Sequence, residues 1–293
     1  MRLAVFTKNR SNPAYAAARL GADRAAQRYN CVVQHYVPQT PDDPEQQCAL
    51  IDEALATRPD AFVLSPVHAT RVDPAIRRIA VAGIPMVGFI NPIEAAASAS
   101  YVGADDASLA RQIANFLFAH LQGQGDVLIV TGPERSVTSI ERLRGFLEAA
   151  QTCPGIRIVG KIAGDYDRAV ARERAATWIS ANGCPQGCLV ANDIMAVGVL
   201  ESLDKASCRA SVVGVNAIPE AIGAIAGGRM LATADFNAMQ MAYLATECAI
   251  RHLQGAPVPN SIELPVQIVH AGNWQQWDHP YEDRTLLTLD DLK

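Results

Sequence analysis

The stretch LAVFTKNRSNPAYAAARLGADRAAQR, residues 3–28, holds one complete strand, corner and helix. Its apolar beginning predicts a strand at Leu3–Thr7, and apolar residues spaced by three and four predict a helix at Ala16–Arg28. Asn12 followed by Pro13 is typical of a helix N-cap with proline in the first turn. Ligands of open α/β sheets bind where strands end, so the polar residues at 7–12 form a candidate binding corner.

Strand-like runs alternate with helix-like segments along most of the remaining chain. The further predicted strands are Cys31–Tyr36, Ala61–Ser65, Ile84–Ile90, Asp126–Thr131, Arg157–Ala163, Gly187–Ala191, Ser211–Val215, Met230–Asp235 and Glu263–His270. The further predicted helices are Glu45–Ala56, Leu109–Leu121, Ile140–Ala150, Ala169–Ser180 and Met239–Leu253, with additional helix starts at Asp73, Asp193 and Pro219. Alternation with short connections predicts parallel sheets that helices cover on both faces.

The length of the chain indicates two lobes. A chain of 293 residues is at the size where a single core usually splits. Residues 1–100 and 126–235 each contain a similar series of strand–helix units, and no Pro/Ser-rich linker separates them. We therefore expect an α/β fold of two similar Rossmann-like lobes, with a cleft between them that closes on a small molecule.

Composition narrows the classes of function. The net charge of −5 and the pI near 5.7 argue against a nucleic-acid surface, which needs clustered lysine and arginine. No apolar stretch reaches the 18 residues of a membrane span. Met1 and Arg2 lead directly into a strand-like run without the pattern of a signal peptide. Two alternatives therefore remain open: a cytoplasmic protein, or an exported protein whose numbering begins at the mature chain.

Signatures of catalysis and of metal binding are missing. The sequence has no P-loop, no G-x-G-x-x-G after a strand and no G-x-S-x-G, so we expect neither an enzyme nor a cofactor. The histidines show no metal-binding spacing, and seven scattered cysteines argue against a disulfide framework. Cys184 and Cys188 are the one close pair. They could bridge their loop or stay reduced, and both outcomes are favoured over a metal site.

Several motifs together carry a family resemblance. They are AVFTKNRSNPAY at 4–15, DAFVLSPVHATRVDPAIRRIAVAGIPMVGF at 60–89, ERLRGF at 141–146, VANDIMAVGVLESL at 190–203 and VVGVNAIPEAIGAIAGGRMLATADFN at 212–237. With them the chain resembles the periplasmic sugar-binding proteins of the ribose-binding type, from about Arg2 to His270. This type I solute-binding fold serves ABC importers and is also the effector domain of lactose-repressor-like regulators.

The resemblance implies a set of ligand-binding positions. The first corner would supply Lys8, Asn9 and Asn12 as polar contacts and Tyr15 as a ring that stacks on a sugar. The second lobe would supply Asn192, Asn216 and an aromatic wall at Tyr166. Amides suit hydroxyls because both can donate and accept. Simpler roles also remain open: Asn192 as a helix N-cap, the two tyrosines as packing residues, and Lys8 as a solvated side chain.

Other matched positions depart from the family. Its Asp-Arg pair after the fourth strand is Ile90–Asn91 here, a second arginine matches Ile140, and a glutamine matches Phe236. We interpret the neighbouring Glu141 and Arg142 as structural residues of the lobe. Losing both arginine clamps makes the pocket more apolar and favours a neutral, less hydroxylated ligand such as a deoxy sugar, a polyol or a lactone. Lys8 would be the only counter-charge for an anion.

The resemblance also implies how the lobes are built and used. The N-terminal lobe would comprise 1–103 plus 237–264 and the C-terminal lobe 104–236 plus 265–293. Three hinge strands would lie near 102–105, 234–237 and 264–267. Hinge closure on the ligand, in the periplasm, would let a monomeric protein deliver it to an ABC permease in the membrane. The alternatives are the ligand-sensing domain of a regulator, whose DNA-binding part would be absent, or of a two-component sensor system.

Overall fold

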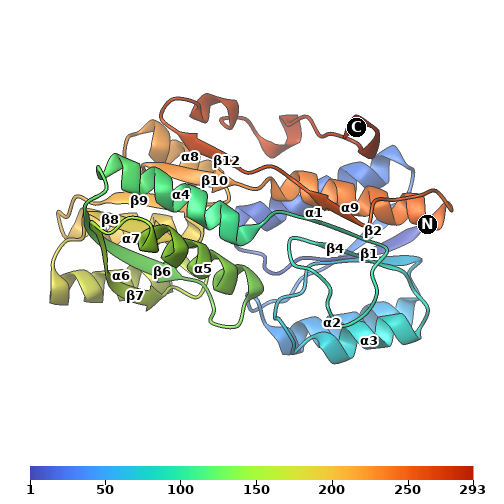
Figure 1. The fold of residues 1–293 in the computed structure, drawn as a ribbon. Coiled ribbons are helices and arrows are strands. Elements are labelled where there is room, and N and C mark those ends of the chain that lie inside the picture. The colour runs from blue at the N-terminus through green and yellow to red at the C-terminus, as the bar shows by residue number, and fades with distance from the viewer. Residues whose placement is uncertain (293) are drawn as a thin grey trace. The chain divides into compact units, whose positions relative to one another are not determined.

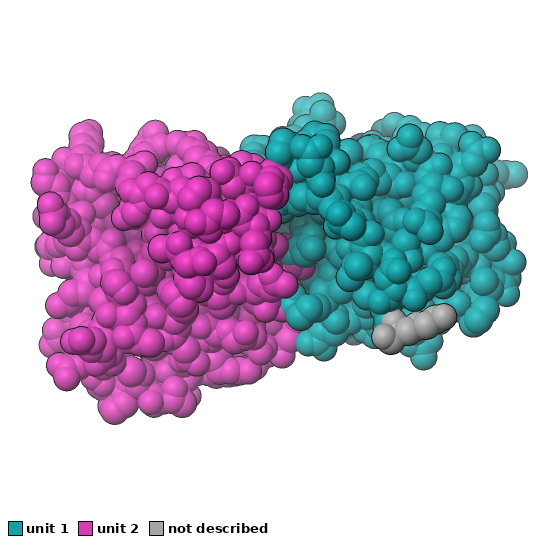
Figure 2. Space-filling view, turned by 90° about the horizontal axis from the view of Figure 1, so that it is seen from above, with its two compact units in different colours: residues 1–104, 237–265, 280–293 teal, residues 105–236, 266–279 magenta. Residues whose placement is uncertain are grey.

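Two sheets of mostly parallel strands carry the fold (Figure 1), as the alternation of elements predicts. The computed structural model describes residues 1–292, and they divide into two units (Figure 2). Unit 1 is formed by Met1–Ala104, by Asn237–Pro265 and by the described residues from Pro280 on. Unit 2 is formed by Asp105–Phe236 and Val266–His279.

Unit 1 contains a six-stranded sheet in the order β11-β5-β4-β3-β1-β2, and its paired strands run parallel. The strands are β1 (Arg2–Phe6), β2 (Val32–Tyr36), β3 (Ala61–Leu64), β4 (Met86–Phe89), β5 (Ser100–Gly103) and β11 (Ser261–Glu263). The helices are α1 (Pro13–Arg28), α2 (Pro44–Thr57), α3 (Asp73–Val81) and α9 (Ala238–Leu253), with 3-10 turns η2 (Tyr281–Asp283) and η3 (Leu289–Asp291). In this unit α1 packs against α9 and α2 against α3.

Unit 2 contains a sheet in the order β12-β10-β9-β8-β6-β7, in which β12 runs antiparallel to β10. The strands are β6 (Gly125–Thr131), β7 (Ile156–Ala163), β8 (Gly187–Val190), β9 (Ser211–Val215), β10 (Ala232–Asp235) and β12 (Gln267–His270). The helices are α4 (Asp106–His120), α5 (Val137–Gln151), α6 (Arg168–Asn182), α7 (Asp193–Lys205) and α8 (Pro219–Ala226), with the 3-10 turn η1 (Trp274–Gln276). In this unit α4 packs against α5 and α6 against α7.

Strand burial explains why the sheets hold together. All residues of β3 and β4 are buried, as expected of parallel strands that helices cover on both faces. In unit 1 the Phe6 ring stacks on Tyr36 and on Phe62, with centroids 4.8 and 5.6 Å away. Such ring pairs add to the free energy gained from burial. The core therefore fixes the strand ends from which the polar corners start.

One predicted strand is wrong. The segment Glu263–His270 does not form a single strand but divides into β11, in the sheet of unit 1, and β12, in the sheet of unit 2. Pro265 lies between them, and proline has no backbone N–H to continue a ladder. The strand β5 is not among the strands predicted from the residue pattern, although its end overlaps the strand near 102–105 that the family resemblance implied.

The C-terminal residues lie in unit 1, so assigning 280–292 to the second lobe is wrong. The Arg24 guanidinium donates to the Arg284 carbonyl oxygen at 2.6 Å. The Gln240 side-chain amide makes two hydrogen bonds of 2.7 Å with the backbone of Leu287, and the Arg251 guanidinium forms an ion pair with Asp290 at 2.7 Å. Helices α1 and α9 thus bind this tail. The chain consequently passes between the units at four places, the fourth at His279–Pro280, and not at three.

A disulfide joins Cys184 to Cys208 within unit 2, with their Cα atoms 5.6 Å apart. The suggested bridge between Cys184 and Cys188 is therefore wrong, because Cys188 is a buried thiol on β8. Within residues 1–292, no helix is both long enough and apolar enough to cross a membrane. The same residues contain no group of three His, Cys, Asp or Glu side chains that could hold a metal ion.

Candidate functional site

The first corner of unit 1 is buried and held by its own amides. Lys8, Asn9 and Asn12 are each exposed by 2% or less. The Asn9 side-chain oxygen accepts from the Asn12 backbone N–H at 2.9 Å, and the Asn12 side-chain oxygen accepts from Ala14 at 3.0 Å. Asn12 is thus the N-cap of α1, which leaves its NH2 group as the part that can donate to a ligand. Tyr15 is also buried, in the first turn of the same helix.

Lys8 is an ion-paired residue and not a solvated side chain. Its ammonium lies 3.1 Å from the Asp42 carboxylate, and the two side chains are 1% and 4% exposed. Asp42 follows β2 at the same end of the sheet, and its backbone N–H donates to the Lys8 carbonyl oxygen at 3.0 Å. Asp42 therefore offsets the charge that Lys8 would offer to an anion.

The corner after β4 brings Ile90 and Asn91 to this same edge of the sheet. Ile90 has a φ of 61°, and its carbonyl oxygen accepts from the Tyr101 hydroxyl at 2.7 Å. Asn91 is fully buried and donates from its amide to the Pro66 carbonyl oxygen at 2.6 Å. The Asn91 side-chain oxygen has no hydrogen-bond partner among the described residues. The hydroxyl of Ser65, the residue after β3, also has none among them. Such buried atoms cost free energy unless a ligand or water satisfies them.

In unit 2, Asn192 and Asn216 follow the neighbouring strands β8 and β9. The Asn192 side-chain oxygen accepts from the Met195 backbone N–H at 3.0 Å, so this residue is the N-cap of α7. Its NH2 group remains as a potential ligand donor. Asn216 has a φ of 122° and is 9% exposed, and its side-chain oxygen lacks a partner within residues 1–292. A strained backbone with an unsatisfied amide is typical of binding sites.

Arg142, which the sequence interpretation assigned to the structure of the lobe, contacts residues next to Asn192 and Phe236. It is 3% exposed and donates to the Ala191 carbonyl oxygen and to Asp106, each at 2.7 Å. Its guanidinium carbon lies 5.3 Å from the centre of the Phe236 ring. The arginine therefore connects the corner before Asn192 with the predicted apolar residue Phe236.

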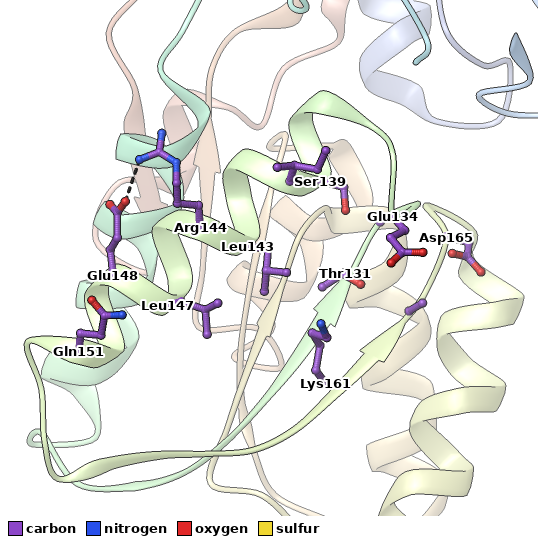
Figure 3. Close-up of a pocket in the computed structure, with 13 residues that line it drawn as sticks. Thr131, Glu134, Ser139, Leu143, Arg144, Leu147, Glu148, Gln151, Lys161 and Asp165 are labelled. Atoms are coloured by element: carbon purple, nitrogen blue, oxygen red, sulfur yellow. Dashed lines mark hydrogen bonds and ion pairs between the residues drawn. The ribbon is translucent and has the colours of Figure 1, made fainter. Parts of the chain in front are cut away.

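Ile140 does not join this group. Its side chain is 45% exposed on α5 and lines a surface groove of about 870 Å³ between α5 and β7 (Figure 3). In Figure 3, Leu143 and Leu147 point from the helix toward the strand that carries Lys161. Two residues along a helix differ by about 200° in direction, so Arg142 points toward Ala191 and Asp106 while Ile140 points into the groove. Helical periodicity with the buried Phe146 could have shown this from sequence.

Tyr166 follows β7 and covers the end of β6. It has a φ of 57° and is 6% exposed, and its hydroxyl shares a hydrogen bond of 2.9 Å with Thr138. A Cβ atom on Gly132 would lie 2.3 Å from the tyrosine ring. Only glycine therefore lets the ring lie this close to the corner after β6.

A buried carboxyl lies directly behind Asn192. Asp193 accepts from the Thr233 hydroxyl at 2.7 Å and from the Ile218 backbone N–H at 3.1 Å. Complete burial, with a smaller contribution from the nearby Asp235 carboxylate, raises the pKa of Asp193 to about 7. Asp235 in turn accepts from the Trp277 indole at 2.7 Å. The bonds of Asp193 thus connect the start of α7 with the corner after β9 and with strand β10.

Comparisons with known proteins agree with the α/β fold of the two units. A family model described as a periplasmic binding protein domain matches residues 3–257. The chain is 27% identical over 195 residues to the xylitol-binding protein of Mycolicibacterium smegmatis, covering 66% of this chain and 56% of that relative. It is 25% identical over 287 residues to the D-ribose/D-allose-binding protein of Pseudomonas aeruginosa, covering 92% and 89%. The structure of a periplasmic solute binding protein from Actinobacillus succinogenes with bound D-allose aligns with a TM-score of 0.87 at 25% identity, covering 94% of this chain and 99% of that one.

Proposed function

Because the chain belongs to the periplasmic binding protein family, in its ribose-binding type of sugar-binding proteins, we propose that it captures a neutral sugar or polyol for an ABC importer. One observation carries the proposal. Asn91 in unit 1 and Asn216 in unit 2 each hold a buried amide oxygen without a partner in the described chain, at the carboxyl edge of their sheets. Hydroxyl groups are the donors that suit such oxygens.

The chemistry of the two edges supports an uncharged ligand. Unit 1 offers amides, the neutralised pair of Lys8 and Asp42, and the apolar Ile90. Unit 2 offers amides, the rings of Tyr166 and Phe236, and Arg142, whose charge faces the Asp106 carboxylate at 2.7 Å. Amides that bind hydroxyls and rings that contact C–H faces form the combination that recognises a polyol or a sugar.

The proposed mechanism is closure of the two units on one ligand. Only a ligand with higher affinity for the closed form can shift the equilibrium, and a shift from mostly open to mostly closed takes about 5 kcal/mol. A micromolar dissociation constant corresponds to about 8 kcal/mol, so a ligand that contacts residues of both units can supply that difference.

The proposed compartment is the periplasm, with a membrane permease as partner. The disulfide between Cys184 and Cys208 supports this, because disulfides persist in oxidising compartments. A ligand-sensing domain would bind the same compounds but signal to a kinase or a DNA-binding domain. Uptake of radiolabelled ligand by cells with and without the gene distinguishes these roles, since only the importer component is required for uptake.

Ligand binding is tested by thermal shift and calorimetry with ribose, allose, xylitol and myo-inositol. A ligand at a hundred times its dissociation constant adds about 2.7 kcal/mol of stability. Replacing Asn216 by Ala should remove the shift, while Asn182→Ala, at an exposed asparagine in α6 of the same unit, should keep it. Absence of any shift in the wild-type protein, or one that survives Asn216→Ala and Asn91→Ala, would contradict the proposal.

A further inference from the structure

A carboxylate that the sequence prediction did not include lies in the first corner of unit 1. Asp42 is held there by its main chain as well as its side chain. Its backbone has a φ of 56°, and its N–H donates to the Lys8 carbonyl oxygen at 3.0 Å. Its Oδ2 lies 3.4 Å from the Asn9 amide nitrogen, and its Oδ1 lies 3.1 Å from the Lys8 ammonium. These contacts fix the carboxylate against two of the proposed ligand residues.

The same carboxylate has a buried oxygen, Oδ1, that can accept a further hydrogen bond beside its ion pair with Lys8. Although Oδ1 lies within ion-pair distance of Lys8, it is buried and has no hydrogen-bond partner in the described part of the chain. A buried carboxylate is most stable when it accepts several hydrogen bonds. A ligand hydroxyl beside the pair could donate to Oδ1 of Asp42 and accept from the ammonium of Lys8.

The charge of the pair decides which ligands fit. Lys8 and Asp42 have side chains that are 1% and 4% exposed, so water screens them little. A ligand carboxylate next to Lys8 would also lie next to Asp42 and be repelled by it. A hydroxyl carries no net charge and can use both partners at once, because it donates and accepts.

We propose that Asp42 and Lys8 together form a hydroxyl-binding subsite that selects neutral polyhydroxy ligands over their carboxylate counterparts. The inference rests on the proposed function and adds a specificity residue to it. In unit 1 the corner after β4 offers the Asn91 amide in place of a carboxylate. Asp42 therefore supplies the negative hydrogen-bond acceptor from the segment after β2.

Asp42→Asn tests the subsite by a change in selectivity. Calorimetry compares ribose and xylitol with their carboxylates, ribonate and xylonate, on the wild type and the variant. The variant should bind the neutral ligand about tenfold to a hundredfold more weakly, because it loses a hydrogen bond to a charged group. It should bind the carboxylate more tightly than the wild type does, because Lys8 is no longer neutralised. A residue with a merely structural role would weaken both ligands together.

Asp43→Asn is the matched control. It changes the same charge one residue away, and the new side-chain oxygen can still accept from Gln46 as the N-cap of α2. Its ratio of neutral to carboxylate affinity should equal that of the wild type. If Asp42→Asn does not fold, Lys8→Met with Asp42→Leu removes both charges. That double variant should lose affinity for the neutral ligand without gaining any for the carboxylate.

The outcomes separate the two proposals. A wild type that binds none of the neutral probes overturns the proposed function and this inference with it. A wild type that binds them, while Asp42→Asn keeps the same ratio of affinities, overturns the subsite alone. An unchanged affinity of the double variant for the neutral ligand likewise overturns the subsite and leaves the proposed function standing.

Discussion

The Arg142 guanidinium carbon lies 5.3 Å from the centre of the Phe236 ring, and its Nη1 donates to the Ala191 carbonyl oxygen. One side chain thus touches the residue before Asn192 and the ring after β10. Arg142→Met should lower the free energy of unfolding by about 3 kcal/mol, because it leaves the mostly buried Asp106 carboxylate unpaired. Urea denaturation measures this. Arg144→Met, at a half-exposed arginine of the same helix, should lower the free energy of unfolding much less, because solvent screens its ion pairs. Equal losses in the two variants would contradict the prediction for Arg142.

Asp193 should make stability depend on pH. Burial raises its pKa to about 7, well above its value in the unfolded chain. Between about pH 4 and pH 7 the folded protein therefore holds a proton that the unfolded chain has lost, and its stability should fall as the pH rises through this window. The effect is at most about 4 kcal/mol. Denaturation of wild type and Asp193→Asn at several pH values should show a difference between them that changes with pH, and parallel curves would refute the prediction.

The disulfide should stabilise unit 2 by restricting its unfolded chain. Cys184 and Cys208 are separated by 24 residues, a loop for which closure contributes about 3 kcal/mol. Cys184→Ser, Cys208→Ser and the double variant should all lose about the same free energy, since each breaks the one bond. Thermal unfolding with and without a reductant checks this. The variants should not respond to reductant, and additive losses in the double variant would be inconsistent with the bond.

Gly132→Ala should displace the Tyr166 ring, because the new Cβ would lie 2.3 Å from it. If the ring forms part of the ligand site, the affinity for the ligand should fall about tenfold or more, whereas the fold of unit 2 should persist. Calorimetry and circular dichroism measure the two effects. Gly223→Ala in α8 is the control, since nothing lies within 4 Å of its added Cβ, and it should leave binding unchanged.

The alternation of strands and helices was predictable because each element carries its own pattern. Buried runs such as Phe62–Leu64 and caps such as Asn12 act locally, and a window of a few residues contains them. Pro265 interrupts the strand expected at 263–270, since proline cannot continue a ladder. Which sheet each half of that segment joins is not contained in the local sequence. The position of residues 280–292 depends on partners on α1 and α9 that lie up to 260 residues away.

The candidate site was predictable where polar residues lie within two positions of a strand end, as Lys8, Asn91, Asn192 and Asn216 do. Whether those residues bind ligand stays a prediction. Alignment by motif did not indicate that Ile140 lines the groove beside α5, because such an alignment ignores the direction of side chains on a helix. Asp42 could not be found from local pattern, because its significance comes from the contact with Lys8, 34 positions earlier in the chain.

The chain passes between the units at four places, so both units are discontinuous in sequence, and the tail from Pro280 on adds a third segment to unit 1. No single cut of the gene therefore yields a fragment that contains all of one unit and nothing of the other. A fragment of residues 105–236 would lack β12, the antiparallel neighbour of β10, and one of residues 1–104 would lack α9, the packing partner of α1. Engineering of either half, by transplantation between relatives or by a split reporter, consequently has to exchange several segments together.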